Sequence, residues 1–195
     1  MRPGKRPENA RIKTQASIDV DLGFIAHIQI GASEAIATSD TAVLAAVTLD
    51  ATEEQLITEG VINPAIPRAL RIKGNAAGIV GNVVITGTNY AGEAITETIA
   101  LNGSTAVNGA KAFSTVANVL FPARNAAGNT VSVGFNDVLG LPYKLAHNTV
   151  LKAYLDNVLE ATAPTVTTSA TAIESNTVDL HSALDGSAVD IYLIA

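Results

Sequence analysis

The sequence predicts an all-β protein whose body is an antiparallel β-sandwich. Val, Ile and Thr account for 55 of the 195 residues, and these β-branched residues favour strands over helices. Apolar and polar residues alternate at 18–22 and again at 28–30, which is the spacing of a strand with one face in the core. Clusters of Gly, Asn and Pro separate the short apolar runs, as turns do between strands.

The clearest predicted element is a β-hairpin in the middle of the chain. Residues 81–87 and 93–101 form its two strands, which a Gly- and Asn-containing turn connects. On the returning strand Ile95, Ile99 and Leu101 share the face that we expect to be buried. Further strands are predicted at 41–49, 113–121, 130–133 and 188–194. Together these strands predict a sandwich of either the immunoglobulin-like or the jelly-roll-like kind.

Two segments fit more than one kind of element. The spacing of Asp50 and Glu53 resembles a capping box, which allows a short helix at 52–58. Residues 150–159 fit either helical spacing or two strands joined by a tight turn at 156–157. We predict the hairpin for the second segment, because every neighbouring segment has a strand pattern.

Two other features concern the organisation of the chain. Residues 63–68 contain two Pro and cannot be a central strand, so they form a connection or an edge. The tetrapeptide Asn-Ala-Ala-Gly occurs at 75–78 and at 125–128, each time shortly before a predicted strand. This repetition indicates either two related turn–strand units or coincidence in a chain rich in Ala, Gly and Asn.

Charge is distributed unevenly along the chain. Residues 1–13 carry a net charge of +4, and the rest of the chain is acidic enough to make the total −6. This pattern predicts an extended basic arm over residues 1–17 and a folded body over residues 18–195. The arm either binds the acidic surface of a neighbouring subunit or is a solvated tail, and its lack of aromatic residues argues against nucleic-acid binding. The residues predicted to contact a partner are Arg2, Lys5, Arg6, Arg11 and Lys13.

Composition excludes several classes of site. The chain contains no Cys, which excludes disulfides, thiolate zinc sites, iron–sulfur clusters and a cysteine nucleophile. The first residues lack the apolar stretch of a signal peptide, and the longest uncharged run, 74–92, contains too many Gly and Asn for a membrane helix. We therefore expect a soluble protein with no membrane partner.

The sequence contains no recognisable catalytic or metal-binding pattern. His27, His147 and His181 do not have the spacing of metal ligands, so structural or exposed roles are expected. Asp19 and Asp21 begin a segment similar to a calcium loop, but the later oxygen ligands and the closing Glu are missing. We predict no catalytic residue, no metal, no cofactor and no enzymatic activity.

A series of short motifs extends from Pro67 to Pro142. In order they are PRALRI (67–72), VVITGT (83–88), ITETIALNG (95–103), KAFSTV (111–116), VSVG (131–134) and LGLP (139–142). This series resembles a β-sandwich module in virion proteins of tailed bacteriophages, which include head decoration and other accessory structural proteins. The resemblance implies a β-module at about 61–145, inserted between strands from the two flanks of the body.

The resemblance also implies a function and a location. It implies a structural component of a tailed-phage virion, assembled in the cytoplasm of the bacterial host, and first of all a capsid decoration or cement protein. Such a protein bridges neighbouring subunits of the major capsid protein or binds other virion proteins, and we expect a homo-oligomer, with a trimer as the first expectation. The alternative is a tail or neck component, or an adhesin for host-surface carbohydrate. Sugar binding needs exposed aromatic residues, and the candidates are Tyr90, Tyr143, Tyr154 and Tyr192.

Overall fold

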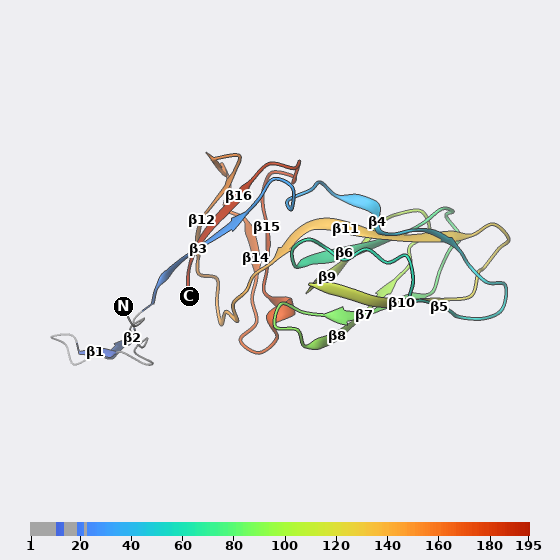
Figure 1. Ribbon diagram of the computed structural model, residues 1–195, viewed down its shortest axis with the longest axis horizontal. Helices are drawn as coiled ribbons and strands as arrows, with labels where there is room; N and C mark the ends of the chain where they lie inside the picture. Colours follow the sequence, from blue (N-terminus) through green and yellow to red (C-terminus); the bar gives the residue numbers. More distant parts are fainter. Residues whose placement is uncertain (1–10, 14–18, 22) are drawn as a thin grey trace.

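The computed structural model describes residues 11–13, 19–21 and 23–195, and these residues form an all-β protein (Figure 1). Every strand pairing among them is antiparallel. The predicted fold class is confirmed. One short 3₁₀ helix, η1 (Ile173–Ser175), interrupts the strands. Within the described ranges there is no helix with the length and hydrophobicity that crossing a membrane would require.

The strands follow one another along the whole described chain. They are β1 (Arg11–Lys13), β2 (Asp19–Asp21), β3 (Ile25–Ile30), β4 (Ser39–Thr48), β5 (Gln55–Ile57), β6 (Arg68–Gly74), β7 (Asn82–Thr88), β8 (Ala94–Ala100), β9 (Val107–Phe113), β10 (Thr115–Phe121), β11 (Thr130–Gly140), β12 (Val150–Leu155), β13 (Val158–Leu159), β14 (Thr165–Thr167), β15 (Thr177–Asp179) and β16 (Val189–Ile194).

Two sheets pack face to face and form the sandwich (Figure 1). One sheet has the strand order β5-β10-β7-β8, and the other has the order β14-β15-β11-β6-β9, with β4 also paired to β11. Val83 and Ile85 of the first sheet and Phe113, Val131 and Val133 of the second are fully buried in one shared core. Removing each such side chain from water contributes about 1.5–3 kcal/mol, so this core is the main support of the sandwich.

The β7–β8 hairpin is confirmed, and its three predicted core residues are buried. Its turn is organised by Asn89, whose Oδ1 accepts hydrogen bonds from the N–H groups of Ala91 and Glu93, both at 3.0 Å. A short amide side chain that bonds the backbone two residues later is a strong turn former. Gly92 completes the turn with a φ of 78°, which suits a residue without a Cβ.

A third sheet has the order β13-β12-β16-β3, and we call it the flank sheet because its strands come from both sides of the sandwich in the sequence. β16 lies in its middle, between β12 and β3. The inner face packs into a second apolar cluster, which includes Ile30, Ala153, Ile191 and Leu193. In Figure 1 this sheet occupies the end of the described body opposite β5. The inserted module at about 61–145 stays a prediction.

The long strand β11 connects the two apolar clusters. Its first half pairs with β4 on one side and β6 on the other, and its last residues, Leu139 and Gly140, pair with β15. Val131 and Val133 therefore belong to the sandwich core, whereas Leu139 belongs to the cluster beneath the flank sheet.

The helix considered at 52–58 is wrong, because this segment contains β5, which pairs with β10. The oxygen Oδ1 of Asp50 does accept hydrogen bonds from the N–H groups of Thr52 and Glu53, at 2.9 and 3.1 Å. These bonds close a turn that no helix follows, and they lower the pKa of Asp50. The capping pattern in the sequence therefore marks an isolated turn and not the start of a helix.

The strand predicted at 113–121 is confirmed as β10 over 115–121, and only its first residue, Phe113, belongs to the preceding strand β9, which lies in the other sheet. β9 ends at Phe113 and pairs with β6, whereas β10 begins at Thr115 and pairs with β7. At the crossing the N–H of Ser114 donates to the carbonyl of Thr88. The strand predicted at 130–133 also continues further, as β11.

The hairpin predicted at 150–159 is confirmed as β12 and β13. Asp156 and Asn157 have φ values of 51° and 61°, so both central residues of the turn have positive φ. This is the mark of a type I′ turn, which matches the twist of the flanking strands and favours Asp and Asn.

Candidate functional site

The predicted basic arm is only partly within the described residues. Arg2, Lys5 and Arg6 lie outside them. Arg11 and Lys13 are in β1, whose backbone pairs with β2 in the register Arg11 with Asp21 and Lys13 with Asp19. Contact of these five basic residues with a partner stays a prediction.

The flank sheet has a cluster of polar and aromatic side chains on its outer face. His27 of β3 lies opposite Tyr192 of β16, and their rings are stacked with centroids 4.4 Å apart. Nε2 of His27 is 2.6 Å from Oδ1 of the buried Asp190. Tyr154 of β12 meets Tyr192 edge-on, at 5.9 Å between centroids. Because β3, β12 and β16 each contribute side chains to this cluster, the cluster fixes the relative positions of the three strands.

Exposed apolar side chains concentrate on this same sheet. Of the eleven large apolar side chains that are exposed in the described part of the chain, five lie on its strands and a sixth directly precedes β3. These six are Phe24, Ile25, Leu151, Val158, Leu159 and Ile194. Such a concentration of exposed apolar surface in one place is typical of a surface that contacts another protein.

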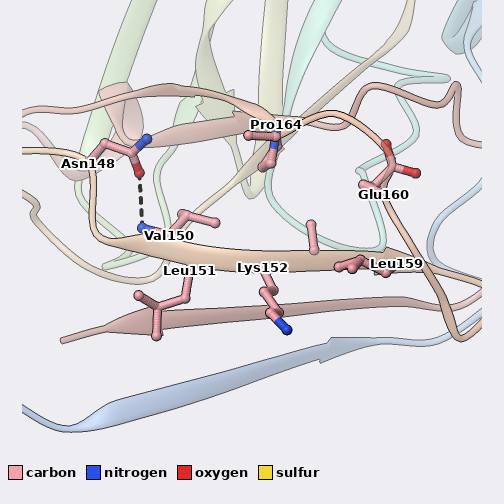
Figure 2. A pocket seen from close by; sticks show the side chains of 9 residues that line it. Asn148, Val150, Leu151, Lys152, Leu159, Glu160 and Pro164 are labelled. Atoms are coloured by element: carbon pink, nitrogen blue, oxygen red, sulfur yellow. Dashed lines mark hydrogen bonds between the residues drawn. The ribbon is translucent and has the colours of Figure 1, made fainter.

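A groove runs beside β12, where β13 has ended (Figure 2). β13 pairs with Tyr154 and Leu155, and the N–H of Glu160 donates to the carbonyl of Ala153. In the described part of the chain, no strand pairs with the residues of β12 before Ala153 on that side. The groove is lined by Leu151, Leu159 and Pro164, with Lys152 and Glu160 at its border. It is mainly apolar and is open to solvent along a strand edge.

A second groove separates β3 from the sandwich. The residues that line it come from the last half of β3, from the connection before β6, and from the end of β11. They are Ile28, Gln29, Ile30, Ile66, Pro67, Tyr90, Gly140 and Pro142. Tyr90 is 52% exposed, so its ring is available to a ligand or partner in this groove.

The candidate tyrosines and histidines are therefore distributed over different places. Tyr154 and Tyr192 come together on the flank sheet, Tyr90 is at the second groove, and Tyr143 packs at the edge of the second apolar cluster. His147 and His181 are exposed in loops. In the ranges that the structure describes, no group of three or more His, Asp or Glu side chains is placed to hold a metal ion.

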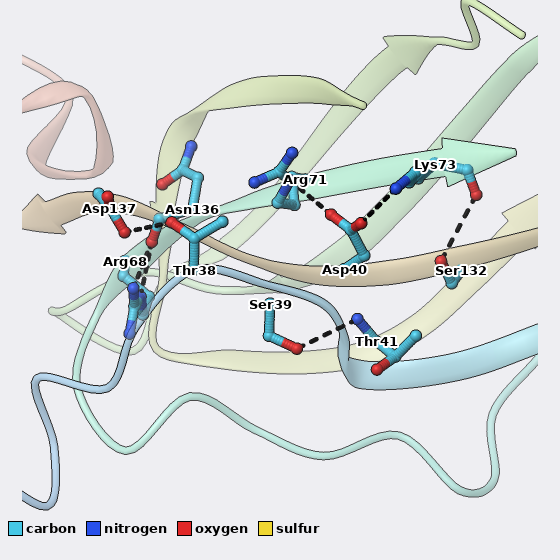
Figure 3. Close-up of polar contacts among 10 residues, drawn as sticks. All are labelled: Thr38, Ser39, Asp40, Thr41, Arg68, Arg71, Lys73, Ser132, Asn136 and Asp137. Carbon is cyan, nitrogen blue, oxygen red and sulfur yellow. Dashed lines mark hydrogen bonds and ion pairs between the residues drawn. The ribbon is translucent and has the colours of Figure 1, made fainter. Parts of the chain in front are cut away.

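The charged residues on β4 and β6 form a separate, structural network (Figure 3). Asp40 accepts an ion pair from Arg71 Nε at 3.1 Å and from Lys73 Nζ at 2.7 Å. Both cations lie on β6 and Asp40 lies on β4, and these two strands flank β11 on either side. The network therefore joins the two neighbours of β11 across its surface.

Arg68 is the one fully buried charged side chain among the described residues. Its guanidinium donates to the carbonyl of Asn136 (Figure 3). It also donates to the carbonyl of Ile36 and lies over the ring of Phe135, 5.1 Å from the centroid. Burial lowers the pKa of Arg68 to about 10, and the nearby carboxylate of Asp137 opposes that shift. Burial also raises the pKa of Asp179, and Asp137 adds to the rise. These carbonyl partners give Arg68 a structural role.

Two buried Asn side chains make hydrogen bonds that hold the segments after β11 in place. Asn176 accepts from the N–H groups of Leu145 and Ser169 and donates to the carbonyls of Ser169 and Ala172. Asn89 donates to carboxylate oxygens of Glu93 and Glu174. The sequence gives no signal for these roles, because a buried Asn and a turn Asn look alike without the fold.

No protein-family model, curated protein or solved structure matches this chain. The geometry must therefore be interpreted directly. Open strand edges, two apolar grooves and a concentration of exposed apolar side chains are suited to binding a protein chain or an apolar ligand surface.

Proposed function

We propose that this protein is a structural component of a tailed-phage virion, and specifically a decoration protein that bridges neighbouring capsid subunits. The observation that carries the proposal is the concentration of exposed apolar side chains on and beside the flank sheet. The resemblance of the motif series from Pro67 to Pro142 to phage virion proteins supports a tailed-phage particle as the protein's place of action. A contact surface on a sparsely charged β-body suits a protein that binds a repeated lattice through many weak contacts.

The basic N-terminal residues add a second contact in this proposal. These basic residues precede Phe24 in the chain, and Phe24 exchanges backbone hydrogen bonds with Ala195 at the end of the β3–β16 pair. Basic residues favour a partner with an acidic surface, and such ion pairs weaken as salt screens them.

The experiment that tests the proposal is labelling of native particles. An antibody to this protein should label the heads of phage particles from the bacterial strain that produces the protein, as seen by negative-stain electron microscopy. Purified particles should contain the protein by mass spectrometry. Its absence from washed particles would contradict the proposal, and labelling confined to the neck or tail would move the protein to that part of the virion.

A second candidate function is host-surface binding, and the exposure of Tyr90 favours it. An aromatic ring beside a groove can stack on the apolar face of a sugar, and Gln29 supplies an amide in the same groove. Tyr90→Ala should then abolish adsorption of the phage to its host while the particles stay intact. Unchanged adsorption would remove this candidate.

A further inference from the structure

Among the residues that the structure describes, β3 forms one edge of the flank sheet and pairs only with β16. An unpaired edge presents backbone N–H and C=O groups to which another strand can bind, and soluble proteins usually protect such an edge with Lys, Pro or a bulge. The sequence of β3, Ile-Ala-His-Ile-Gln-Ile, contains neither Lys nor Pro. Its register with β16 is unbroken from one end to the other. The edge is therefore open to a further strand.

The hydrogen bonds at the start of β3 show which groups face outward. The N–H of Phe24 donates to the carbonyl of Ala195 at 3.2 Å, and the N–H of Ala195 donates to the carbonyl of Phe24 at 2.9 Å. These two residues are a hydrogen-bonded pair of an antiparallel ladder, and such pairs recur at every second residue. The backbone groups of Ile25, His27 and Gln29 consequently point away from β16, toward the open edge.

The first half of β3 in one copy of the chain is complementary to the last half of β3 in another copy. The first half carries Ile25, which is 71% exposed. The last three residues, 28–30, line the groove that also contains Tyr90 and Pro142. Successive residues of a strand point to opposite faces, so a groove lined by three successive residues lies against the edge of β3. The exposed apolar half of one β3 thus matches the groove half of another.

We propose that two copies of this chain associate through β3, which pairs antiparallel with itself about a two-fold axis at His27. In this register Ile25 lies opposite Gln29 of the partner subunit, and Gln29 lies opposite Ile25 of the partner subunit. All outward backbone groups of these three residues are then hydrogen-bonded, and the two flank sheets become one continuous sheet. A two-fold contact of this kind is self-complementary by construction.

The charges of the edge fit a second copy better than a charged segment. β3 contains no Lys, Arg, Asp or Glu, and neither do the residues that line its groove. A basic segment such as residues 1–13 would lose its hydration there, and the carboxylate of Asp190 is already in contact with His27. His27 lies on the proposed axis, and each copy brings the carboxylate of its own Asp190, 2.6 Å from the imidazole, to balance any charge there.

The inference deepens the proposed structural function and rests on it only for the role of the pair in a particle. It replaces the expected trimer by a two-fold pair. Two paired strands of this length form an interface at the small end of the range, which predicts weak, concentration-dependent association in solution. When many copies are held on one particle, the association between two copies would be stronger, because the β3 contact then forms within one assembly.

Sedimentation velocity of the full chain, from about 1 µM to about 500 µM, tests the association at the concentrations where a small interface binds. The native chain should pass from monomer to dimer. Ile25→Lys and Gln29→Pro should each raise the dissociation constant at least about tenfold, because they place a charge or remove a donor at the edge. Ile62→Lys changes an Ile that is 61% exposed elsewhere and should leave dimerisation unchanged. Circular dichroism melting checks that each variant is folded.

Single-cysteine variants test the register, since the natural chain has no Cys. Oxidised His27→Cys should form a covalent dimer, because the two Cα atoms of a hydrogen-bonded pair on the axis are about 5.5 Å apart, within disulfide range. Gln29→Cys should not, because its two copies lie about four residues, or about 13 Å, apart along the strands.

Each outcome has a definite meaning. A monomer at every concentration, an oligomer that Ile25→Lys and Gln29→Pro leave unchanged, or cross-linking at position 29 in place of 27 would overturn the inference. Binding of a soluble sugar panel in the groove of a monomeric chain would also overturn it, in favour of host-surface binding. Particle labelling is measured separately, so the virion function can fail while the dimer stands, or the reverse.

Discussion

At the scale of single residues, Glu97 is the most informative side chain of the sandwich. It lies between Ile95 and Ile99 on the buried side of β8. Its Oε1 accepts hydrogen bonds from the N–H groups of Ala110 and Lys111 on β9, at 2.6 and 3.2 Å, whereas its buried Oε2 has no hydrogen-bond partner among the residues that the structure describes. Glu97 thus connects the edge strand of one sheet to the edge strand of the other.

The pKa of Glu97 predicts a pH dependence of stability. Burial raises this pKa, and the hydrogen bonds from β9 and the charge of Lys111 only partly oppose the rise. A carboxyl group with a raised pKa binds more protons in the folded state, so its contribution to stability falls as the pH rises through the folded pKa. Glu97→Gln removes that loss and keeps an oxygen acceptor for Ala110 and Lys111.

Urea unfolding of the native chain and Glu97→Gln at pH 4 and pH 7 measures the effect. The variant should gain stability relative to the native chain between the two pH values. Glu54→Gln makes the same chemical change at an exposed position and is the matched control. A pH-dependent gain no larger than that of Glu54→Gln would contradict the account of Glu97.

Sequence reasoning is weakest at the scale of single residues. It identified Tyr90 as a candidate because Tyr90 is next to a predicted turn, and it named His27 only to set it aside. It could not foresee that His27 would meet Asp190 and Tyr192, because those residues are on a strand 163 residues away. The buried roles of Arg68 and Asn176 were equally invisible, since they depend on carbonyl and amide groups that only the fold brings together.

At the scale of elements, the close approach of β4 to its neighbour β11 depends on Gly134. A Cβ at this position would lie 1.8 Å from the carbonyl oxygen of Ser39 and 2.6 Å from the carbonyl carbon of Asp40. The register between β4 and β11 shifts at the same place. The absence of a side chain therefore allows the two backbones to approach closely.

Gly134→Ala should destabilise the protein by more than about 3 kcal/mol, because backbone atoms must move to admit the methyl group. Gly78→Ala is the matched control, because a Cβ there meets nothing within 4 Å and the backbone is not in the left-handed region. That substitution should change stability by less than about 1 kcal/mol. Equal effects of the two substitutions in thermal unfolding would rule out the close-approach argument.

Elements were more predictable than residues, and their errors have local physical causes. Alternation of apolar and polar residues located β3, β8 and β16, because each has one face in a core. The helix considered at 52–58 failed because Asp50 caps an isolated turn as well as it would cap a helix. The strand predicted at 113–121 begins too early because the chain passes from one sheet to the other at Ser114, and periodicity carries no information about such a crossing.

The repeated tetrapeptide proves to mark two loops in contact. Asn75 accepts from the N–H of Thr130 and donates to the carbonyl of Gly128, while Asn125 accepts from the N–H of Val80. Each loop also closes the same backbone turn, at 76–79 and at 126–129. The two identical tetrapeptides therefore form the same kind of turn, and hydrogen bonds from their Asn side chains connect the two loops.

At the scale of the whole molecule, the two apolar clusters predict two regions of unequal response to mutation. Ile191 is buried beneath the flank sheet, and Ile85 is buried in the sandwich core. Each substitution by Ala should cost about 2–5 kcal/mol. Because the two clusters are separate, Ile191→Ala should increase hydrogen exchange mainly in β3, β12 and β16, and Ile85→Ala mainly in β7, β8 and β10. Equal loss of protection everywhere in both variants would show one cooperative core.

Composition predicted the fold class, but it carries no information about where a contact surface lies. Sparse charge and positive mean hydropathy belong to the chain as a whole. The flank sheet collects the exposed apolar residues only because β3, β12 and β16 meet in space. No local pattern in the sequence pairs these strands with one another, so the candidate site emerges from tertiary structure.

The pairing of β3 with β16 has a consequence for synthesis on the ribosome. His27 cannot contact Asp190 until a further 163 residues have been synthesised. At about 5–20 residues per second, this synthesis takes roughly 8–30 s. Throughout that interval the nascent chain carries β3 with both of its edges free. Polysomes translating this message would hold many such strands close together, so the time before release is when mispairing between chains has its best opportunity.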